Sequence, residues 1–170
     1  MSVFGAERPE RIASVADQVE TFELEAPVSA IHFLGERAVF VGDEATCVLA
    51  KPGVAPRQVA VTDGAILCAV SDGARVVMGG DDGRIMALDA AGEVTTLATD
   101  AKRRWIDCLA LHKDGTVAWS AGKNAVVRGR DGVEKTWEAP STVGGLAFAP
   151  KGVRLAVAHY GGATLWFPNM

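Results

Sequence analysis

A pattern of about 40 residues recurs four times along the chain, and this period constrains the fold more than any other feature. Each repeat opens with an apolar segment that ends in a glycine-bearing turn: VSAIHFLG from Val28, ILCAVSDG from Ile66, IDCLALHKDG from Ile106 and VGGLAFAPKG from Val143. The third positions of these segments are Ala30, Cys68, Cys108 and Gly145, which gives steps of 38, 40 and 37 residues. These four positions hold only small side chains, as expected where strands crowd around a narrow channel.

Two further runs rich in Val, Ile, Thr and Ala follow the opening segment of every repeat, and the first three repeats add a fourth run. The runs show no helical periodicity across the repeats. Four short strands per 40 residues predict the blade of a propeller. We therefore expect an all-β chain, a β-propeller of four-stranded antiparallel blades, with about four blades at residues 26–61, 62–99, 100–139 and 140–170. The last blade lacks its fourth strand.

The stretches GARVVMGGDDGRIMALD and TVGGLAFAPKGVRLAVAHYGGATLWF resemble the WD-repeat β-propellers. They follow that family's blade pattern of strand, Pro-Asp-Gly-like turn, strand, Asp-containing turn and a strand that ends in Trp-Asp. The resemblance covers about residues 20–167. Asp82 matches the aspartate of the family's turn, but its histidine partner is missing, and Leu88-Asp89 or Trp166-Phe167 replaces the terminal Trp-Asp. The resemblance implies the fold, and it lends little to the function.

The acidic pair Asp81-Asp82 lies in GGDDGR, between the second and third strands of its repeat. A short connection between antiparallel strands favours Gly, Asn and Asp, because these residues tolerate positive φ. Adjacent strand residues also alternate faces, so the two carboxylates should point apart. We interpret the pair as a corner rather than a metal or catalytic site.

The N-terminal region holds a strand without a repeat of its own. ETFELEAPV resembles EKTWEAPSTV at the end of the third repeat, since both place Glu-Ala-Pro before a first strand. Residues 20–25 are therefore expected to be a fourth-type strand that closes the last blade and removes an exposed sheet edge. Residues 1–19 form an extension in which RPERIASVADQV has the apolar spacing of a short amphipathic helix.

Four blades lie at the lower limit of known propellers, and the resembled family usually closes with seven. Three arrangements are open. The chain is part of a longer propeller with further blades, two chains pair head-to-tail into an eight-bladed ring, or four blades close alone. An open arc would expose apolar sheet faces at both ends, which favours completion by other blades or by self-association.

Composition and motifs exclude several classes of function. A formal charge of −4 argues against nucleic-acid and membrane-surface binding, and the charged start of the chain leads us to expect a cytoplasmic protein. Three cysteines without a C-x-x-C spacing make disulfides and structural zinc unfavourable, and His32, His112 and His159 do not converge on one metal. No nucleophile or phosphate-binding motif is present. We expect no catalytic residues, no metal and no cofactor.

The loop DAKRRWID, residues 100–107, is the most unusual connection, since Arg and Trp are enriched at binding hot spots. A solvated basic loop with Trp105 packed between blades is the alternative. In a propeller this loop shares a face with the turns between second and third strands, which gathers the candidate partner-binding residues Asp81, Lys102, Arg103, Arg104, Trp105, Lys123, His159 and Tyr160. We expect a non-catalytic scaffold that binds other proteins. The alternative function is an enzyme or small-ligand-binding propeller with its site at the channel mouth.

Overall fold

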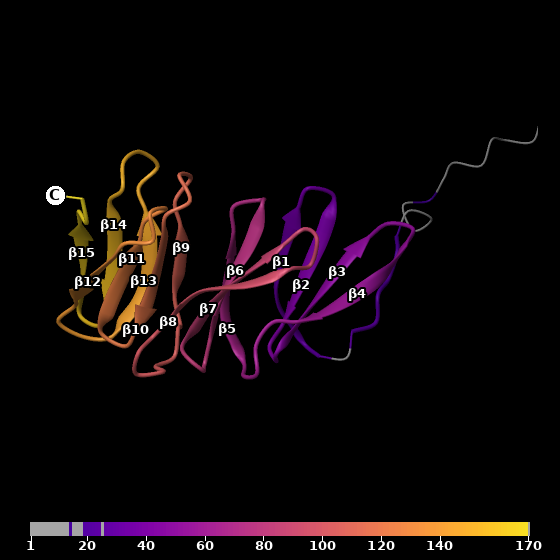
Figure 1. Cartoon of the computed structure of the whole chain (residues 1–170), viewed down its shortest axis with the longest axis horizontal. Helices are drawn as coiled ribbons and strands as arrows, with labels where there is room; N and C mark the ends of the chain where they lie inside the picture. The colour runs from indigo at the N-terminus through magenta and orange to yellow at the C-terminus, as the bar shows by residue number, and fades with distance from the viewer. Residues whose placement is uncertain (1–13, 15–18, 25, 170) are drawn as a thin grey trace, which may run out of the picture.

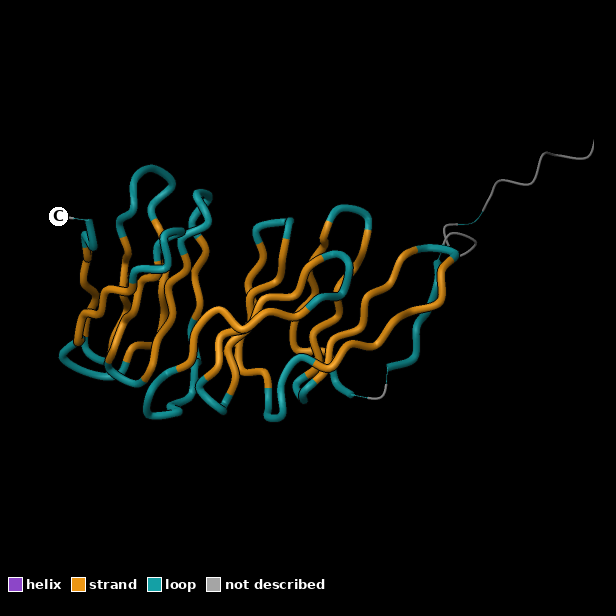
Figure 2. The backbone as a smooth tube through the Cα atoms, viewed as in Figure 1, coloured by secondary structure: helices purple, strands orange, loops and turns teal. Residues whose placement is uncertain are grey.

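A computed structural model describes residue 14, residues 19–24 and residues 26–169. All regular structure in these residues is β: fifteen strands form four antiparallel sheets, each a simple meander in chain order (Figures 1 and 2). This confirms the expected all-β architecture of about four blades. The expected helix at residues 8–19 lies almost entirely outside the described residues. No helix that could span a membrane occurs in the described part of the chain.

The four sheets follow the sequence repeats. Blade 1 contains β1 (Val28–Leu34), β2 (Arg37–Gly42), β3 (Thr46–Lys51) and β4 (Val54–Ala60). Blade 2 contains β5 (Ile66–Ser71), β6 (Arg75–Gly80), β7 (Arg84–Asp89) and β8 (Val94–Thr99). Blade 3 contains β9 (Leu109–Leu111), β10 (Val117–Ala121), β11 (Asn124–Arg128) and β12 (Glu134–Glu138). Blade 4 has three strands, β13 (Val143–Phe148), β14 (Leu155–His159) and β15 (Gly162–Trp166).

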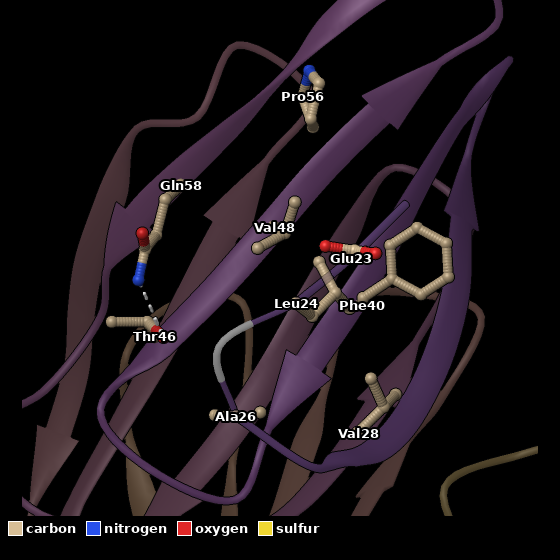
Figure 3. A pocket seen from close by; sticks show the side chains of 10 residues that line it. Glu23, Leu24, Ala26, Val28, Phe40, Thr46, Val48, Pro56 and Gln58 are labelled. Atoms are coloured by element: carbon tan, nitrogen blue, oxygen red, sulfur yellow. Dashed lines mark hydrogen bonds between the residues drawn. The ribbon is translucent and has the colours of Figure 1, made fainter. Parts of the chain in front are cut away.

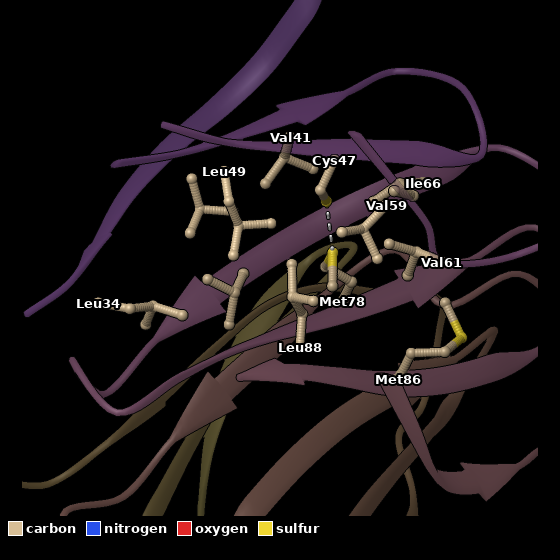
Figure 4. Packing of buried hydrophobic residues seen from close by; sticks show 12 residues of the cluster. Leu34, Val41, Cys47, Leu49, Val59, Val61, Ile66, Met78, Met86 and Leu88 are labelled. Atoms are coloured by element: carbon tan, nitrogen blue, oxygen red, sulfur yellow. Dashed lines mark hydrogen bonds between the residues drawn. The ribbon is translucent and has the colours of Figure 1, made fainter. Parts of the chain in front are cut away.

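The blades stand side by side in an open arc, with blade 1 and blade 4 at opposite ends (Figure 1). Three hydrophobic clusters join blades 1 and 2, blades 2 and 3, and blades 3 and 4. The first cluster includes the fully buried Met78 and Met86, and Cys47 Sγ lies 3.4 Å from Met78 Sδ (Figure 4). Among the described residues no such cluster joins blade 4 to blade 1. The chain therefore does not close a four-bladed ring by itself.

The small side chains at the third repeat positions have a different cause from the one expected. Two of them face the next blade rather than a crowded channel: Ala30 packs against the cluster between blades 1 and 2, and Cys68 against the cluster between blades 2 and 3. Cys68 Sγ lies 3.1 Å from the carbonyl oxygen of Ile106, in the chain that enters blade 3. The small volume is needed because the next blade approaches closely at this point.

Residues 19–24 lie in no strand of this structure. They run across the free face of blade 1, where the ring of Phe22 lies 6.2 Å from that of Phe40. Pairing of the 20–25 segment with a fourth blade stays a prediction.

Gly79 tests the interblade packing. A Cβ atom at this position would lie 2.5 Å from Ile106 Cγ2 and 2.7 Å from the Ile106 carbonyl oxygen. Ile106 is fully buried, so it has little room to move. We expect Gly79→Ala to lower the free energy of unfolding by about 1–3 kcal/mol through overpacking. Thermal and denaturant unfolding measure this.

The matched control is Gly144→Ala, because a Cβ at Gly144 would meet no atom within 4 Å. Equal stability of the two variants would contradict the tight packing of blade 2 on blade 3.

Candidate functional site

One end of the arc carries the turns between second and third strands and the loops that connect successive blades. A meander of four strands places these connections at the same end of each sheet. Backbone hydrogen bonds join them: Asp81 N donates to Ala65 O at 3.1 Å, and Tyr160 N donates to Thr142 O at 3.2 Å. The candidate residues predicted from the sequence all lie at this end, which we call the loop end.

Asp100 organises the loop between blades 2 and 3. Its carboxylate accepts hydrogen bonds from the backbone N–H groups of Lys102 and Arg104 at 3.0 Å and from the Arg104 guanidinium at 2.6 and 3.1 Å. The side-chain hydrogen bonds from Arg104 hold the pKa of Asp100 below its ordinary value. Since the Asp100 side chain is only 8% exposed, Arg104 serves to hold the loop together.

Arg103 adopts a left-handed backbone conformation, with φ of +54°. It is the only non-glycine residue with positive φ among the described residues. Its backbone passes close to Gly83, where an added Cβ would lie 2.7 Å from Arg103 Cα. A non-glycine residue at positive φ is strained, and such positions cluster at functional sites.

Five of the predicted residues present exposed side chains at the loop end: Lys102, Arg103, Trp105, Lys123 and Tyr160. Trp105 is 63% exposed and Tyr160 is 89% exposed. Trp105 is therefore not packed between blades, which was the alternative to a binding role.

The other three predicted residues make internal contacts. Asp81 Oδ1 accepts a hydrogen bond from Ala65 N at 3.0 Å, and Arg104 bonds to Asp100 as described. His159 is partly buried, with Nε2 3.2 Å from Thr164 Oγ1 and its ring 6.4 Å from that of Trp137. Their side chains support the loop end rather than project from it.

Asp82 ties the turn of blade 2 to the loop that precedes that blade. Its carboxylate accepts hydrogen bonds from Thr62 Oγ1 at 3.0 Å and from the backbone and side chain of Arg84. Arg84 also reaches Asp63 at 2.9 Å. This cluster of Thr62, Asp82 and Arg84 occupies the turn where the resembled family would use an aspartate with a histidine partner. The carboxylates of Asp81 and Asp82 thus accept hydrogen bonds from different partners, as expected for a turn between two strands.

The cysteine thiols are unsuited to nucleophilic chemistry. Burial raises the pKa of both Cys47 and Cys68 to about 12, and it also raises the pKa of Cys108. A thiol with so high a pKa stays protonated at neutral pH, and the thiolate is the reactive form. In the described ranges no three His, Cys, Asp or Glu side chains gather as a metal site would require.

The opposite end of the arc carries a groove that the sequence did not reveal. It lies between blades 2 and 3, has a volume of about 810 Å³, and is lined by charged side chains that include Asp72, Arg75, Lys113, Arg128 and Arg130. These residues come from turns in two different repeats. The sequence pattern that could have indicated this groove is the presence of charged residues at equivalent turn positions of neighbouring repeats. The positive and negative side chains of the groove partly neutralise one another, and Arg75 forms an ion pair with Asp72.

Comparison with solved structures shows the fold. The β-propeller domain of Cps50 (Swd1) from Myceliophteria thermophila matches with a TM-score of 0.68 and 15% identity, over 82% of this chain and 52% of that one. A chain of the mitotic checkpoint complex matches with a TM-score of 0.70 and 16% identity, over 90% of this chain and 52% of that one. The computationally designed protein Ika4 matches with a TM-score of 0.70 and 17% identity, over 85% of this chain and 93% of that one.

The chain thus spans about half the length of the Cps50 and mitotic checkpoint chains that it resembles. These matches confirm the fold expected from the resemblance to WD-repeat β-propellers. No protein-family model and no curated protein sequence matches the chain.

The Asp82 cluster predicts a pH-dependent contribution to stability. Burial raises the pKa of Asp82, but hydrogen bonds from Arg84 and Thr62 outweigh it, so the pKa lies below its ordinary value of 3.8. The charged form is therefore favoured by folding, and its contribution is present above about pH 4 and lost as the pH falls through the lowered pKa. We expect Asp82→Asn to lower the free energy of unfolding by about 2 kcal/mol at neutral pH.

Chemical unfolding of both proteins across pH 2–7 measures this effect, and the difference between them should shrink below about pH 4. Asp63→Asn is the matched control, because Asp63 bonds to the same arginine but its side chain is 96% exposed. A difference between wild type and Asp82→Asn that stays constant down to pH 2 would contradict the assignment.

Proposed function

We propose that the chain is a non-catalytic scaffold that binds other proteins through the loop end. The docking face consists of Lys102, Arg103, Trp105, Lys123 and Tyr160. The observation that carries the proposal is the exposure of two large aromatic side chains, Trp105 and Tyr160, on connections that are themselves ordered by hydrogen bonds. Tryptophan, tyrosine and arginine are the residues most enriched at binding hot spots.

The ordering of these connections supports a binding role. Asp100 fixes the backbone on both sides of Arg103, and Ser141 Oγ donates a hydrogen bond to the carbonyl oxygen of Tyr160. A partner would therefore meet anchors that lose little conformational freedom on binding. The strained backbone at Arg103 agrees with this, because a glycine would adopt that conformation more readily.

The alternative, an enzyme or small-ligand-binding propeller with its site at the channel mouth, requires reactive groups that converge. The protonated thiols of Cys47 and Cys68 weigh against it. The similar chain of the mitotic checkpoint complex supports a role in protein assembly by analogy of fold alone.

Single substitutions separate binding from stability. We expect Trp105→Ala and Tyr160→Ala to leave the melting temperature nearly unchanged, because both side chains are largely exposed. Arg103→Gly should leave the free energy of unfolding unchanged or raise it by up to about 1 kcal/mol, since it relieves the positive φ. All three should weaken capture of the same partner protein from a lysate of the source organism by about tenfold or more.

Val133→Ala is the matched control, because Val133 is 55% exposed in a turn at the opposite end of blade 3. A protein captured by wild type and by Val133→Ala, but lost with the three docking-face variants, supports the proposal. Capture that is as strong with Trp105→Ala, Tyr160→Ala and Arg103→Gly as with wild type would refute the proposal.

A further inference from the structure

We infer that a second copy of this chain completes the propeller: blade 4 of each copy packs on blade 1 of the other, and residues 20–24 serve as the fourth strand of the partner's blade 4. The product is an eight-bladed ring of two chains. The inference does not depend on the docking function proposed above.

The four blades are similar to about half of a larger ring. Blades 1 and 4 lie at its opposite ends (Figure 1), and the arc superposes on about half of the β-propeller domain of Cps50. A ring of that size leaves room for about as many blades again as this chain supplies. Eight blades lie within the range that propellers adopt.

The free face of blade 4 repeats, position by position, the face with which blade 3 covers blade 4. Strand registers align the free residues Gly145, Ala147, Ala156, Ala158, Ala163 and Leu165. They correspond to Cys108, Ala110, Ala118, Ser120, Ala125 and Val127 of blade 3. Ala118 and Ala125 are fully buried under blade 4, whereas Ala158 and Ala163 are exposed and Leu165 is 67% exposed. Blade 4 therefore presents a small-residue face of the kind that already receives a blade within this chain.

The free face of blade 1 has the complementary character. Its residues are Ile31, Phe33, Ala38, Phe40, Val48 and Ala50. The equivalent face of blade 4, which packs on blade 3, is Leu146, Phe148, Leu155, Val157, Thr164 and Trp166. Large side chains stand at the same first-strand positions in both, but Ile31 is 57% exposed and Phe33 is 64% exposed. Inside the chain, the small-residue face of blade 3 thus meets the large-residue face of blade 4. A small-residue face on blade 4 and a large-residue face on blade 1 remain unpaired at the two ends of the arc.

Residues 20–24 already lie where the fourth strand of a preceding blade would lie. When Glu-Ala-Pro is aligned, Leu24 corresponds to Trp137 of β12, the fourth strand of blade 3. Trp137 packs over the face of blade 4 against Trp166, and Leu24 lies over the face of blade 1 beside Phe40 and Val48 (Figure 3).

Polar contacts repeat this correspondence. Arg57 of β4 donates to the carbonyl oxygen of Ala91, and Lys135 of β12 donates to that of Pro168. Each acceptor follows the third strand of the next blade. Glu20, which aligns two residues before Lys135, also reaches this place on blade 1: its carboxylate accepts a hydrogen bond from Gly53 N at 3.3 Å, after the third strand. Residues 20–24 thus lie on blade 1 as the fourth strand of a preceding blade would, but this chain has no preceding sheet with which they could pair.

The missing sheet is the one that blade 4 supplies. The third strand pairs with a fourth in blades 1, 2 and 3, whereas β15 is the edge of a three-stranded sheet among the described residues. A single copy cannot join the two, because they lie at opposite ends of the arc (Figure 2). In a dimer with a two-fold axis along the channel, residues 20–24 of each copy complete the sheet of blade 4 in the other copy. Because the same contact between blade 4 and blade 1 is made twice, the ring closes with two chains.

The mass in solution tests this inference directly. We expect light scattering with size exclusion to give twice the 17.8 kDa chain mass for wild type. Ala158→Glu and Phe33→Asp each place a charge on one of the two faces and should weaken dimerisation by about 100-fold or more. Each residue is exposed in the single chain, so both variants should fold as monomers. Ala74→Glu, in an exposed turn of blade 2, is the control and should remain dimeric.

A mixture of the two monomeric variants distinguishes this contact from others. The Phe33→Asp chain keeps an intact blade 4 face and the Ala158→Glu chain keeps an intact blade 1 face, so the mixture should regain a dimer through one contact. A dimer built from two identical faces would survive one of the variants and would not show this complementation. Ala163→Glu replaces Ala158→Glu if the far-UV spectrum shows that the latter does not fold. A wild-type monomer at every concentration, an assembly larger than two chains, or failure of folded variants to complement would overturn the inference.

Discussion

Packing of one blade face on the next is the constraint on which the rest of this structure depends. Each four-stranded sheet is apolar on both faces, and it buries them only when a neighbour stands on each side. The contact between blades 3 and 4 shows how this is achieved: alanines of β10 and β11 receive Leu155, Phe148 and Trp166. Close approach sets residue size elsewhere too, since Gly79 and Cys68 leave space for the chain that enters blade 3 at Ile106.

The repeat period predicted the architecture because it depends on spacing, which a single sequence shows directly. The sheet order and the turns at Asp81 and Asp82 followed from strand alternation and turn chemistry. Interblade contacts were not predictable in the same way. The reason expected for the small side chains at Ala30 and Cys68 was wrong, because the face that these residues present depends on a bulge in the first strands of blades 1 and 2. The positive φ of Arg103 and the groove between blades 2 and 3 also required coordinates.

Stability and recognition fall on different residues of the loop end. Asp82 and Asp100 draw Arg84 and Arg104 into ion pairs that fix the turns. This leaves Lys102, Arg103 and Lys123 with the aromatic rings of Trp105 and Tyr160 as the exposed set. The sequence identified the loop but could not separate Arg104 from Arg103, because adjacent arginines in a loop look alike until the partner of each is seen.

We infer that the blades of this chain are half of a ring whose remaining contacts repeat its internal ones. A crystal structure of the full chain would show whether the two ends of the arc meet in this way. We expect eight blades around one channel, with residues 20–24 of one chain hydrogen-bonded along β15 of the other and Phe33 buried against Ala158 of that chain. A four-bladed ring closed within one chain, or an arc whose blade 1 and blade 4 both face solvent, would contradict it.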